Sequence, residues 1–267
     1  MGHTRLGRLP RTRKWQDVVG LLGTGADTAD VAAATLAASK RGLEDAARDS
    51  ALVHSFWLLT QLPLCARKAN FVEELARVGV SVADEPTLME LVGGLSDAVD
   101  DHVYRKGDRT DLGEMAQLGA AETLTSVLSQ RTTSLFETTA EDVRRELARL
   151  GTPTNFSVLA REFFARLTER YLTYFLSREL SNQLGSVSAN RQFREALSLH
   201  CKQASKIVEK FAADWFSKAN YQTGITPRKA AGFVGHAVTK LGAELQKGAL
   251  LAVAKASWIL ALGGGVT

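Results

Sequence analysis

This chain of 267 residues has few of the residues that build disulfide-rich or sheet-rich proteins. It contains two cysteines, Cys65 and Cys201, five prolines and 7% aromatic residues. The two cysteines are far apart and lie within helical patterns, which does not match a disulfide framework and favours a reducing, cytoplasmic environment. Val and Ile rarely form the alternating runs that strands need. The sequence therefore predicts an all-α fold, a multi-helix bundle.

The chain also lacks the common signatures of catalysis and cofactor binding. The segment GLLGTGAD has glycines but no Lys-Ser or Lys-Thr, so it is not a phosphate loop. Neither CxxC nor HExxH occurs, and no serine stands in a nucleophile elbow. The sequence therefore predicts no cofactor, no metal site and no catalytic residue.

No uninterrupted hydrophobic run is long enough to cross a membrane. Residues 249–262 are apolar except for Lys255 and Ser257, and as a helix they rise only about 21 Å, short of a bilayer core of roughly 30 Å. We expect this segment to be buried in the chain's own bundle. The alternatives are that this segment is buried against a partner protein or inserts shallowly into a membrane. The basic N-terminus is interrupted at Gln16 and Asp17 and does not predict an export signal.

Charge is distributed unevenly along the chain, although the net charge is only +4. Residues 1–14 carry five cations and no carboxylate. Residues 201–267 hold nine Lys and Arg against three acids, whereas the 186 residues between these ends have a net charge of −7. Basic ends around an acidic middle indicate an anionic partner and say little about fold.

Apolar periodicity predicts a series of helices in the first 150 residues. We expect one over 13–22, and a long one that starts at Thr28, with Gly42 as a possible break, and stops at Pro63. Further helices are predicted over 65–78, closed by Gly79, over 86–105, beginning at Pro86, and over 111–131. Thr139 and Asp142 form a capping box for the next helix, which ends with Gly151 at the C′ position.

Three long helices are predicted after residue 150. The first, from 155 to 185, carries an apolar stripe made of Phe156, Phe163, Leu167, Tyr171, Tyr174 and Phe175. The second covers 186–220, and Thr226-Pro227 caps the third. We expect a basic arm at 1–14, an N-terminal helical region at 15–150 and a C-terminal bundle at 151–267, or else one continuous domain.

Two basic clusters are candidate contacts for nucleic acid or for an acidic protein surface. Guanidinium groups in a flexible arm pair with phosphate oxygens, and lysines at i, i+4 and i+8 share one helix face. A solvated face or solubilising tail is the alternative, and Phe216 and Tyr221 nearby can stack on a base or complete the core. The candidate contacts are Arg5, Arg8, Arg11, Arg13, Lys14, Lys202, Lys206, Lys210, Arg228 and Lys229.

The string RDSALVHSFW places Arg48 six residues before His54, and REALSLH gives Arg194 and His200 the same spacing. This pattern loosely resembles the Arg-polar-His signature of HEPN ribonucleases, which are also all-α. The resemblance implies RNA cleavage by Arg and His residues that meet at a dimer interface. In the alternative interpretation, His54 fills a partly polar corner beside Phe56 and Trp57.

Taken together, these patterns predict a non-enzymatic helical subunit or adaptor of a larger intracellular assembly, with other protein subunits and nucleic acid or an acidic protein surface as partners. A HEPN-like ribonuclease is the first alternative. A membrane-active or helix-docking effector that acts through the apolar C-terminal helix is the second, although we expect no membrane partner.

Overall fold

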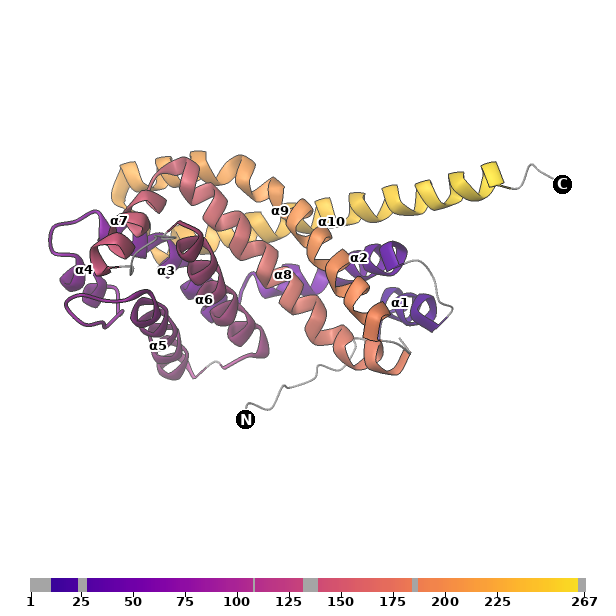
Figure 1. The fold of residues 1–267 in the computed structure, drawn as a ribbon, viewed down its shortest axis with the longest axis horizontal. Coiled ribbons are helices and arrows are strands. Elements are labelled where there is room, and N and C mark those ends of the chain that lie inside the picture. The colour runs from indigo at the N-terminus through magenta and orange to yellow at the C-terminus, as the bar shows by residue number, and fades with distance from the viewer. Residues whose placement is uncertain (1–10, 24–27, 108, 132–138, 184–186, 264–267) are drawn as a thin grey trace.

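The computed structural model describes residues 11–23, 28–107, 109–131, 139–183 and 187–263. Within these ranges every regular element is a helix. The predicted all-α fold is therefore confirmed. Figure 1 shows the helices packed against each other, coloured from indigo near the N-terminus to yellow near the C-terminus. None of the helices among the described residues is both long and apolar enough to cross a membrane.

The first seven helices are short to medium in length. They are α1 (Arg13–Gly23), α2 (Thr28–Ala46), α3 (Ser50–Ala66), α4 (Phe71–Arg77), α5 (Leu88–Lys106), α6 (Asp111–Arg131) and α7 (Ala140–Leu150). Trp15 on α1 is 2% exposed and packs against Phe175, with 5.9 Å between ring centroids. This contact anchors the beginning of the described chain to a helix that is much later in the sequence.

The predicted long helix from Thr28 to Pro63 is wrong in two places. The helix is interrupted at 47–49, where the Asp49 side chain accepts a hydrogen bond from the Leu52 amide and caps α3. Gly42 stays inside α2, where a Cβ would collide with the Tyr171 hydroxyl. Pro63 lies inside α3, which continues to Ala66.

Two further predicted boundaries shift for local reasons. Cys65 belongs to α3, so the helix predicted over 65–78 is reduced to α4, and Gly79 closes it with a φ of +89°. Helix α5 begins at Leu88 and not at Pro86. Thr87 is its N-cap, because the Thr87 side chain accepts from the Glu90 amide while the Glu90 carboxylate accepts from the Thr87 amide.

The capping box predicted for α7 is confirmed. The Thr139 hydroxyl accepts from the Asp142 amide at 3.2 Å, and the Asp142 carboxylate accepts from the Thr139 amide at 3.2 Å. Gly151 is the C-cap residue with an ordinary φ of −76°, and not a left-handed C′ glycine. Its small size is used for packing, since a Cβ there would lie 3.1 Å from the Pro63 carbonyl oxygen of α3.

Three long helices follow and form the body of the molecule. They are α8 (Pro153–Gln183), α9 (Val187–Thr223) and α10 (Pro227–Gly263), as predicted except for small shifts at their ends. Helices α8 and α9 pack side by side along their lengths, and α10 packs on α9 and α2 (Figure 1). Helices on either side of 151–155 therefore touch each other, and the division of the chain into two regions there stays a prediction.

An aromatic cluster fills the core where α3, α8, α9 and α10 meet. Phe56 of α3 lies parallel to Phe233 of α10 with 4.9 Å between centroids. Phe156 of α8 stacks on Phe216 of α9 at 4.1 Å, and both rings are at most 1% exposed. The predicted stripe on α8 faces this core, with Phe156, Phe163, Leu167 and Tyr171 buried and Tyr174 and Phe175 partly buried.

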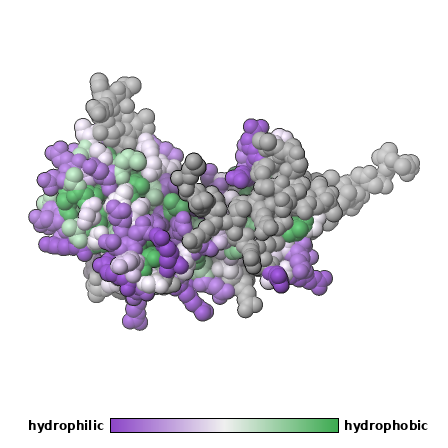
Figure 2. All heavy atoms as spheres, turned by 90° about the horizontal axis from the view of Figure 1, so that it is seen from below, coloured by the Kyte–Doolittle hydropathy of each residue, from purple (hydrophilic) through white to green (hydrophobic). Residues whose placement is uncertain are grey.

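The molecule is longer than it is wide, and the yellow end of α10 runs beyond the other helices (Figure 1). The apolar segment 249–262 belongs to this end, and its side chains lie outside the described residues. Hydrophilic residues cover most of the coloured surface in Figure 2, around small separate hydrophobic areas. On this face of the described chain, the large apolar side chains are therefore mostly inside.

Candidate functional site

Three lysines line the outer side of α9, as the sequence predicts. Lys202, Lys206 and Lys210 are exposed, whereas the opposite side of the helix is buried through Cys201, Ser205, Val208 and Ala212. We call Lys202, Lys206 and Lys210 the lysine face. Because α-helices rise about 1.5 Å per residue, the three side chains project from a line of roughly 12 Å.

The carboxylate nearest to these lysines in sequence is turned away from them. Glu209 precedes Lys210, yet it accepts a hydrogen bond from Arg161 of α8 at 2.7 Å. No ion pair joins the lysine face to a carboxylate among the described residues. The positive charge of the lysine face is therefore not neutralised by this part of the chain.

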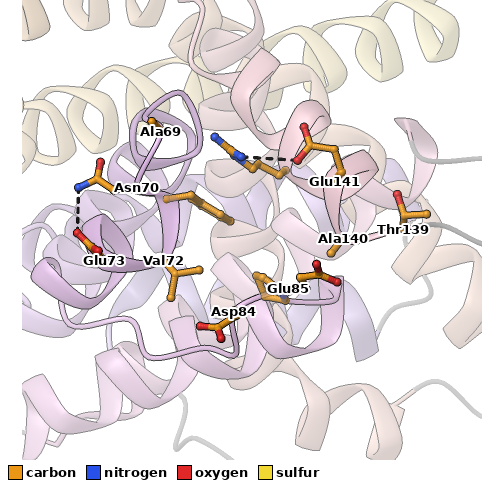
Figure 3. Close-up of a pocket in the computed structure, with 12 residues that line it drawn as sticks. Ala69, Asn70, Val72, Glu73, Asp84, Glu85, Thr139, Ala140 and Glu141 are labelled. Atoms are coloured by element: carbon orange, nitrogen blue, oxygen red, sulfur yellow. Dashed lines mark hydrogen bonds and ion pairs between the residues drawn. The ribbon is translucent and has the colours of Figure 1, made fainter.

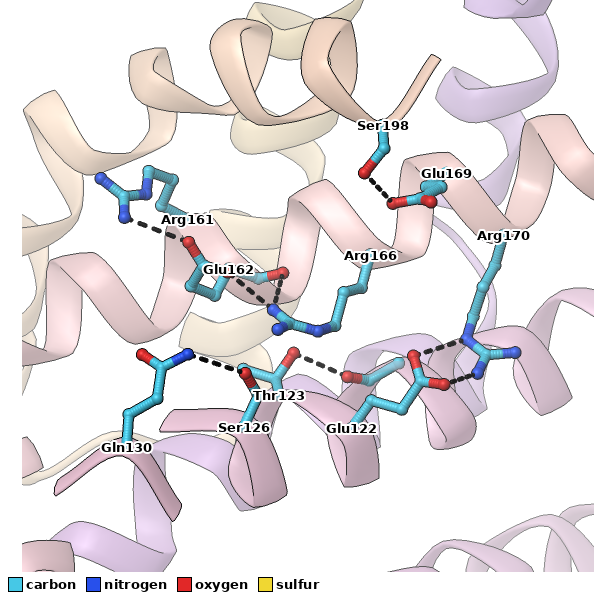
Figure 4. A network of polar contacts seen from close by, with 11 residues as sticks. Glu122, Thr123, Ser126, Gln130, Arg161, Glu162, Arg166, Glu169, Arg170 and Ser198 are labelled. Atoms are coloured by element: carbon cyan, nitrogen blue, oxygen red, sulfur yellow. Dashed lines mark hydrogen bonds and ion pairs between the residues drawn. The ribbon is translucent and has the colours of Figure 1, made fainter. Parts of the chain in front are cut away.

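The arginines of α8, unlike the lysine face, are paired with carboxylates (Figure 4). Arg166 donates to Glu162 at 2.7 Å, and Arg170 pairs with Glu122 of α6. Burial alone would raise the pKa of Glu162, but hydrogen bonds from Arg166 and Arg161 outweigh it and lower the pKa. These ionic contacts join α6, α8 and α9, so the arginines of α8 stabilise helix packing and are not available as a binding surface.

The Arg161 guanidinium is the link between this network and α9. Its partial burial opposes the charged form, but hydrogen bonds to Glu162 and Glu209 raise its pKa above the ordinary value. Ser198 of α9 also donates to Glu169 of α8 at 3.0 Å (Figure 4). Both contacts fix how α9 is rotated about its axis, and so they direct the lysine face outward.

The two predicted contacts at the start of α10 have different roles. Arg228 is exposed and has no described ion-pair partner. Lys229 is partly buried and its Nζ donates to the carbonyl oxygens of Ala219 and Gly224, at 2.8 and 2.9 Å. A cation that binds carbonyls at a helix C-terminus stabilises that end of the helix. Lys229 therefore holds the turn between α9 and α10.

The predicted N-terminal contacts are only partly described. Arg11, Arg13 and Lys14 are exposed at the start of α1, and Arg5 and Arg8 lie outside the described residues. Helix α1 is anchored by Trp15 to Phe175, which lies roughly 28 Å along α8 from Phe156. Phe156 stacks on Phe216, close to the end of α9 that leads to Arg228. The structure thus groups the lysine face but places Arg11, Arg13 and Lys14, the described part of the arm, toward the opposite end of the α8–α9 pair from Arg228.

A groove between α4 and α7 forms a hollow in the described surface, with a volume of about 540 Å³. The residues that line it include the apolar Phe71, Val72 and Pro86 and the charged Glu73, Asp84, Glu85, Glu141 and Arg144 (Figure 3). Arg144 lies over the Phe71 ring, 5.7 Å from its centroid, and donates to the Lys68 carbonyl at 2.9 Å. A groove of this charge suits a cationic group, whereas the basic clusters suit an anion.

The histidines of the HEPN-like pattern do not gather with their arginines. His54 is partly buried on α3 and its ring stacks on His102, whereas Arg48 is exposed in the turn before the helix. On α9, Nδ1 of His200 is 2.9 Å from the Ala196 carbonyl oxygen. Residues six apart on a helix point about 120° away from each other, so Arg194 and His200 face different sides of α9.

The two cysteines are buried and unpaired with each other. Burial raises the pKa of Cys65 to about 11, and it raises the pKa of Cys201 further. Thiols of this kind react poorly, since the thiolate is the reactive form. In the described ranges, no group of three or more His, Cys, Asp or Glu side chains is arranged to hold a metal ion.

Comparison with known proteins adds no further assignment. No family model matches the chain, and no curated protein or solved structure matches it either.

The sequence predicts the lysine face, but it does not show why no carboxylate neutralises the charge of these lysines. That reason is the Arg161–Glu209 contact, which joins residues 48 positions apart in sequence. The sequence also left open whether Phe216 or Tyr221 is a stacking platform. The structure buries Phe216 to 1% exposure and leaves Tyr221 93% exposed. Helical periodicity is the signal that separates them, because Phe216 follows the buried Ala212 by four residues whereas Tyr221 falls on the side of the lysines.

Proposed function

We propose that this protein is a non-catalytic helical subunit or adaptor that binds the phosphate backbone of a nucleic acid through the lysine face of α9. The observation that supports the proposal is that Lys202, Lys206 and Lys210 are exposed together, while Glu209 beside them is held by Arg161. Like charges four residues apart on a helix repel each other by a few tenths of a kcal/mol. An anionic ligand would remove that repulsion.

The spacing of the lysine face suits a phosphate backbone. Neighbouring lysines are separated by about 6 Å along α9, and a nucleic-acid strand carries one charge for roughly every 3.4 Å of duplex axis. Successive lysines can therefore reach alternate phosphates. Lysine is a flexible point charge without the planar fork of arginine, so these contacts would position a strand without reading its sequence.

Binding through three ammonium groups has a measurable signature in its salt dependence. Each neutralised phosphate releases counterions, which gives a slope of about −0.7 per contact for a single strand and about −0.9 for a duplex in a plot of log K against log salt. The test measures fluorescence anisotropy of labelled oligonucleotides between about 50 and 200 mM salt. Replacing Lys202, Lys206 and Lys210 by Gln is expected to weaken binding and to reduce the slope by about 2.

A matched variant removes three cations from another surface. Arg77→Gln, Lys106→Gln and Arg109→Gln change the net charge equally but lie on α4, α5 and the segment that follows α5. Arg77 and Arg109 have carboxylate partners there, Glu74 and Asp100. The control is expected to keep most of the wild-type affinity. Equal losses in the two triple variants would contradict the proposal, and so would tighter binding to poly-glutamate of equal charge, which would favour an acidic protein partner.

A further inference from the structure

Tyr221 stands on the same side of α9 as the lysine face. At about 100° per residue, Lys202, Lys206, Lys210 and Tyr221 fall within an arc of roughly 100° around the helix axis. The tyrosine is 93% exposed, and no described ring lies against it. From Lys202 to Tyr221 the row extends about 28 Å along α9.

Cations flank the tyrosine on both sides in sequence. Lys210 precedes it by three turns, and the exposed Arg228 follows it beyond the turn at Gly224, which has a φ of +74°. Lys218 is also near, but its ammonium pairs with Asp214 at 2.8 Å. An exposed aromatic residue alone carries little information. Its alignment with unneutralised lysines is what points to a ligand with both phosphates and aromatic rings.

The other strongly exposed tyrosine has different surroundings. Tyr104 on α5 is 88% exposed, and the acidic residues Asp97, Asp100 and Asp101 precede it on the same helix. The basic residues Arg105 and Lys106 follow it, so the charges around Tyr104 nearly cancel and a phosphate backbone would gain little there. Tyr104 is therefore a control for Tyr221, with similar exposure and without a row of lysines beside it.

We propose that the ligand of this surface is single-stranded nucleic acid, with its backbone on the lysine face and an unpaired base stacked on Tyr221. This inference rests on the proposed function and makes it more specific. Bases in a duplex already stack on each other, so their flat faces cannot reach a tyrosine ring. An unpaired base has a free face, and such stacking on aromatic side chains tolerates any sequence. The row is long enough for several nucleotides, within the roughly 4–16 that single-strand binding sites contact.

The test compares three 12-nucleotide probes on the intact chain at one low salt concentration. The probes are oligothymidylate, the same backbone with abasic sites in place of the bases, and a 12-base-pair duplex. Wild-type protein is expected to bind oligothymidylate about 10-fold more tightly than the abasic strand. Tyr221→Ser is expected to remove that difference and to leave duplex binding unchanged. Tyr221→Phe is expected to keep the difference, because the ring remains.

Each outcome separates the two proposals. If the triple lysine variant loses binding but Tyr221→Ser binds oligothymidylate as the wild type does, the base-stacking inference is overturned and the proposed function stands. The same inference is overturned if Tyr104→Ser has as large an effect as Tyr221→Ser. If the wild type binds none of the three probes, both proposals are overturned.

Discussion

The imidazole rings of His54 on α3 and His102 on α5 lie parallel, with 4.0 Å between their centroids and 7° between their planes. Trp57 also packs against His54, with 5.3 Å between ring centroids. The pKa of His54 is lowered to about 4, mainly by burial and also by the charges of His102 and Arg105, although a hydrogen bond to the Ala98 backbone opposes this. The pKa of His102 is also lowered, by burial and by Lys106 and Arg105. Two neutral rings can stack in this way, and two charged rings would repel.

The first prediction is that folding stability falls as pH is lowered from about 6.5 toward 4. In that window the unfolded chain binds a proton at His54 that the folded chain does not bind, so acid favours unfolding. The loss is expected to be on the order of 2 kcal/mol, after allowance for partial exposure. Urea unfolding at pH 7 and pH 4.5 measures it.

Substitution identifies the source of this pH dependence. His54→Phe keeps a ring against His102 and Trp57 but cannot bind a proton, so its stability should change less over the same window. His236, exposed on α10 beside Phe211, provides the control variant His236→Gln. A pH dependence in His54→Phe as steep as that of the wild type would show that other groups cause it.

The second prediction concerns two adjacent glycines on α5. A Cβ at Gly94 would lie 2.8 Å from the Ser81 carbonyl oxygen and 3.1 Å from Val80, whereas a Cβ at Gly93 would meet nothing within 4 Å. Gly94→Ala is therefore expected to destabilise the fold by about 1–3 kcal/mol, because the backbone of the 78–87 segment must move. Gly93→Ala is expected to stabilise it by about 0.5–1 kcal/mol through helix propensity.

Thermal and urea unfolding of the two variants compare them directly. The pair is informative because both substitutions add one methyl group to the same turn of the same helix. If Gly94→Ala is as stable as Gly93→Ala, then the packing of α5 against Ser81 is looser than this structure has it.

The third prediction separates the N-terminal arm from the lysine face. Removal of residues 1–10 deletes Arg5 and Arg8 but keeps Trp15, whose burial anchors α1. We expect this truncation to lower affinity for oligonucleotides and to reduce the salt slope by about 1.4 for a single strand. Since the truncation and the triple lysine variant remove different cations, their effects on binding are expected to add. Anisotropy measurements on the combined variant test this, and a combined loss much smaller than the sum would argue for a shared contact.

Local patterns predicted the helices well where one short motif decides the boundary. The Thr139 and Asp142 capping box is an example, since its reciprocal hydrogen bonds involve residues three apart. The start of α5 was misplaced at Pro86, although Thr87 and Glu90 have the same spacing and form a capping box. The break before α3 was missed for a different reason. Asp49 there also accepts a hydrogen bond from Thr110, which is distant in sequence, and Gly42 is a packing position for Tyr171.

The candidate site also contains residues that local spacing predicts and residues whose role depends on tertiary contacts. Lysines at i, i+4 and i+8 share a helix face by geometry alone, and their exposure followed from the apolar residues opposite. Lys229 could not be recognised as a structural residue, because its ammonium binds carbonyls at the end of another helix. Its neighbour Arg228 is exposed.

The sequence by itself determined the all-α fold, the three long C-terminal helices and the face on which the lysines stand. These depend on periodicity and on contacts within a few residues. Only the tertiary structure decided that Glu209 pairs with Arg161 and that Arg11, Arg13 and Lys14 lie apart from Arg228. Each of these depends on how one helix is rotated and placed against another, and that is set by packing among residues distant in sequence.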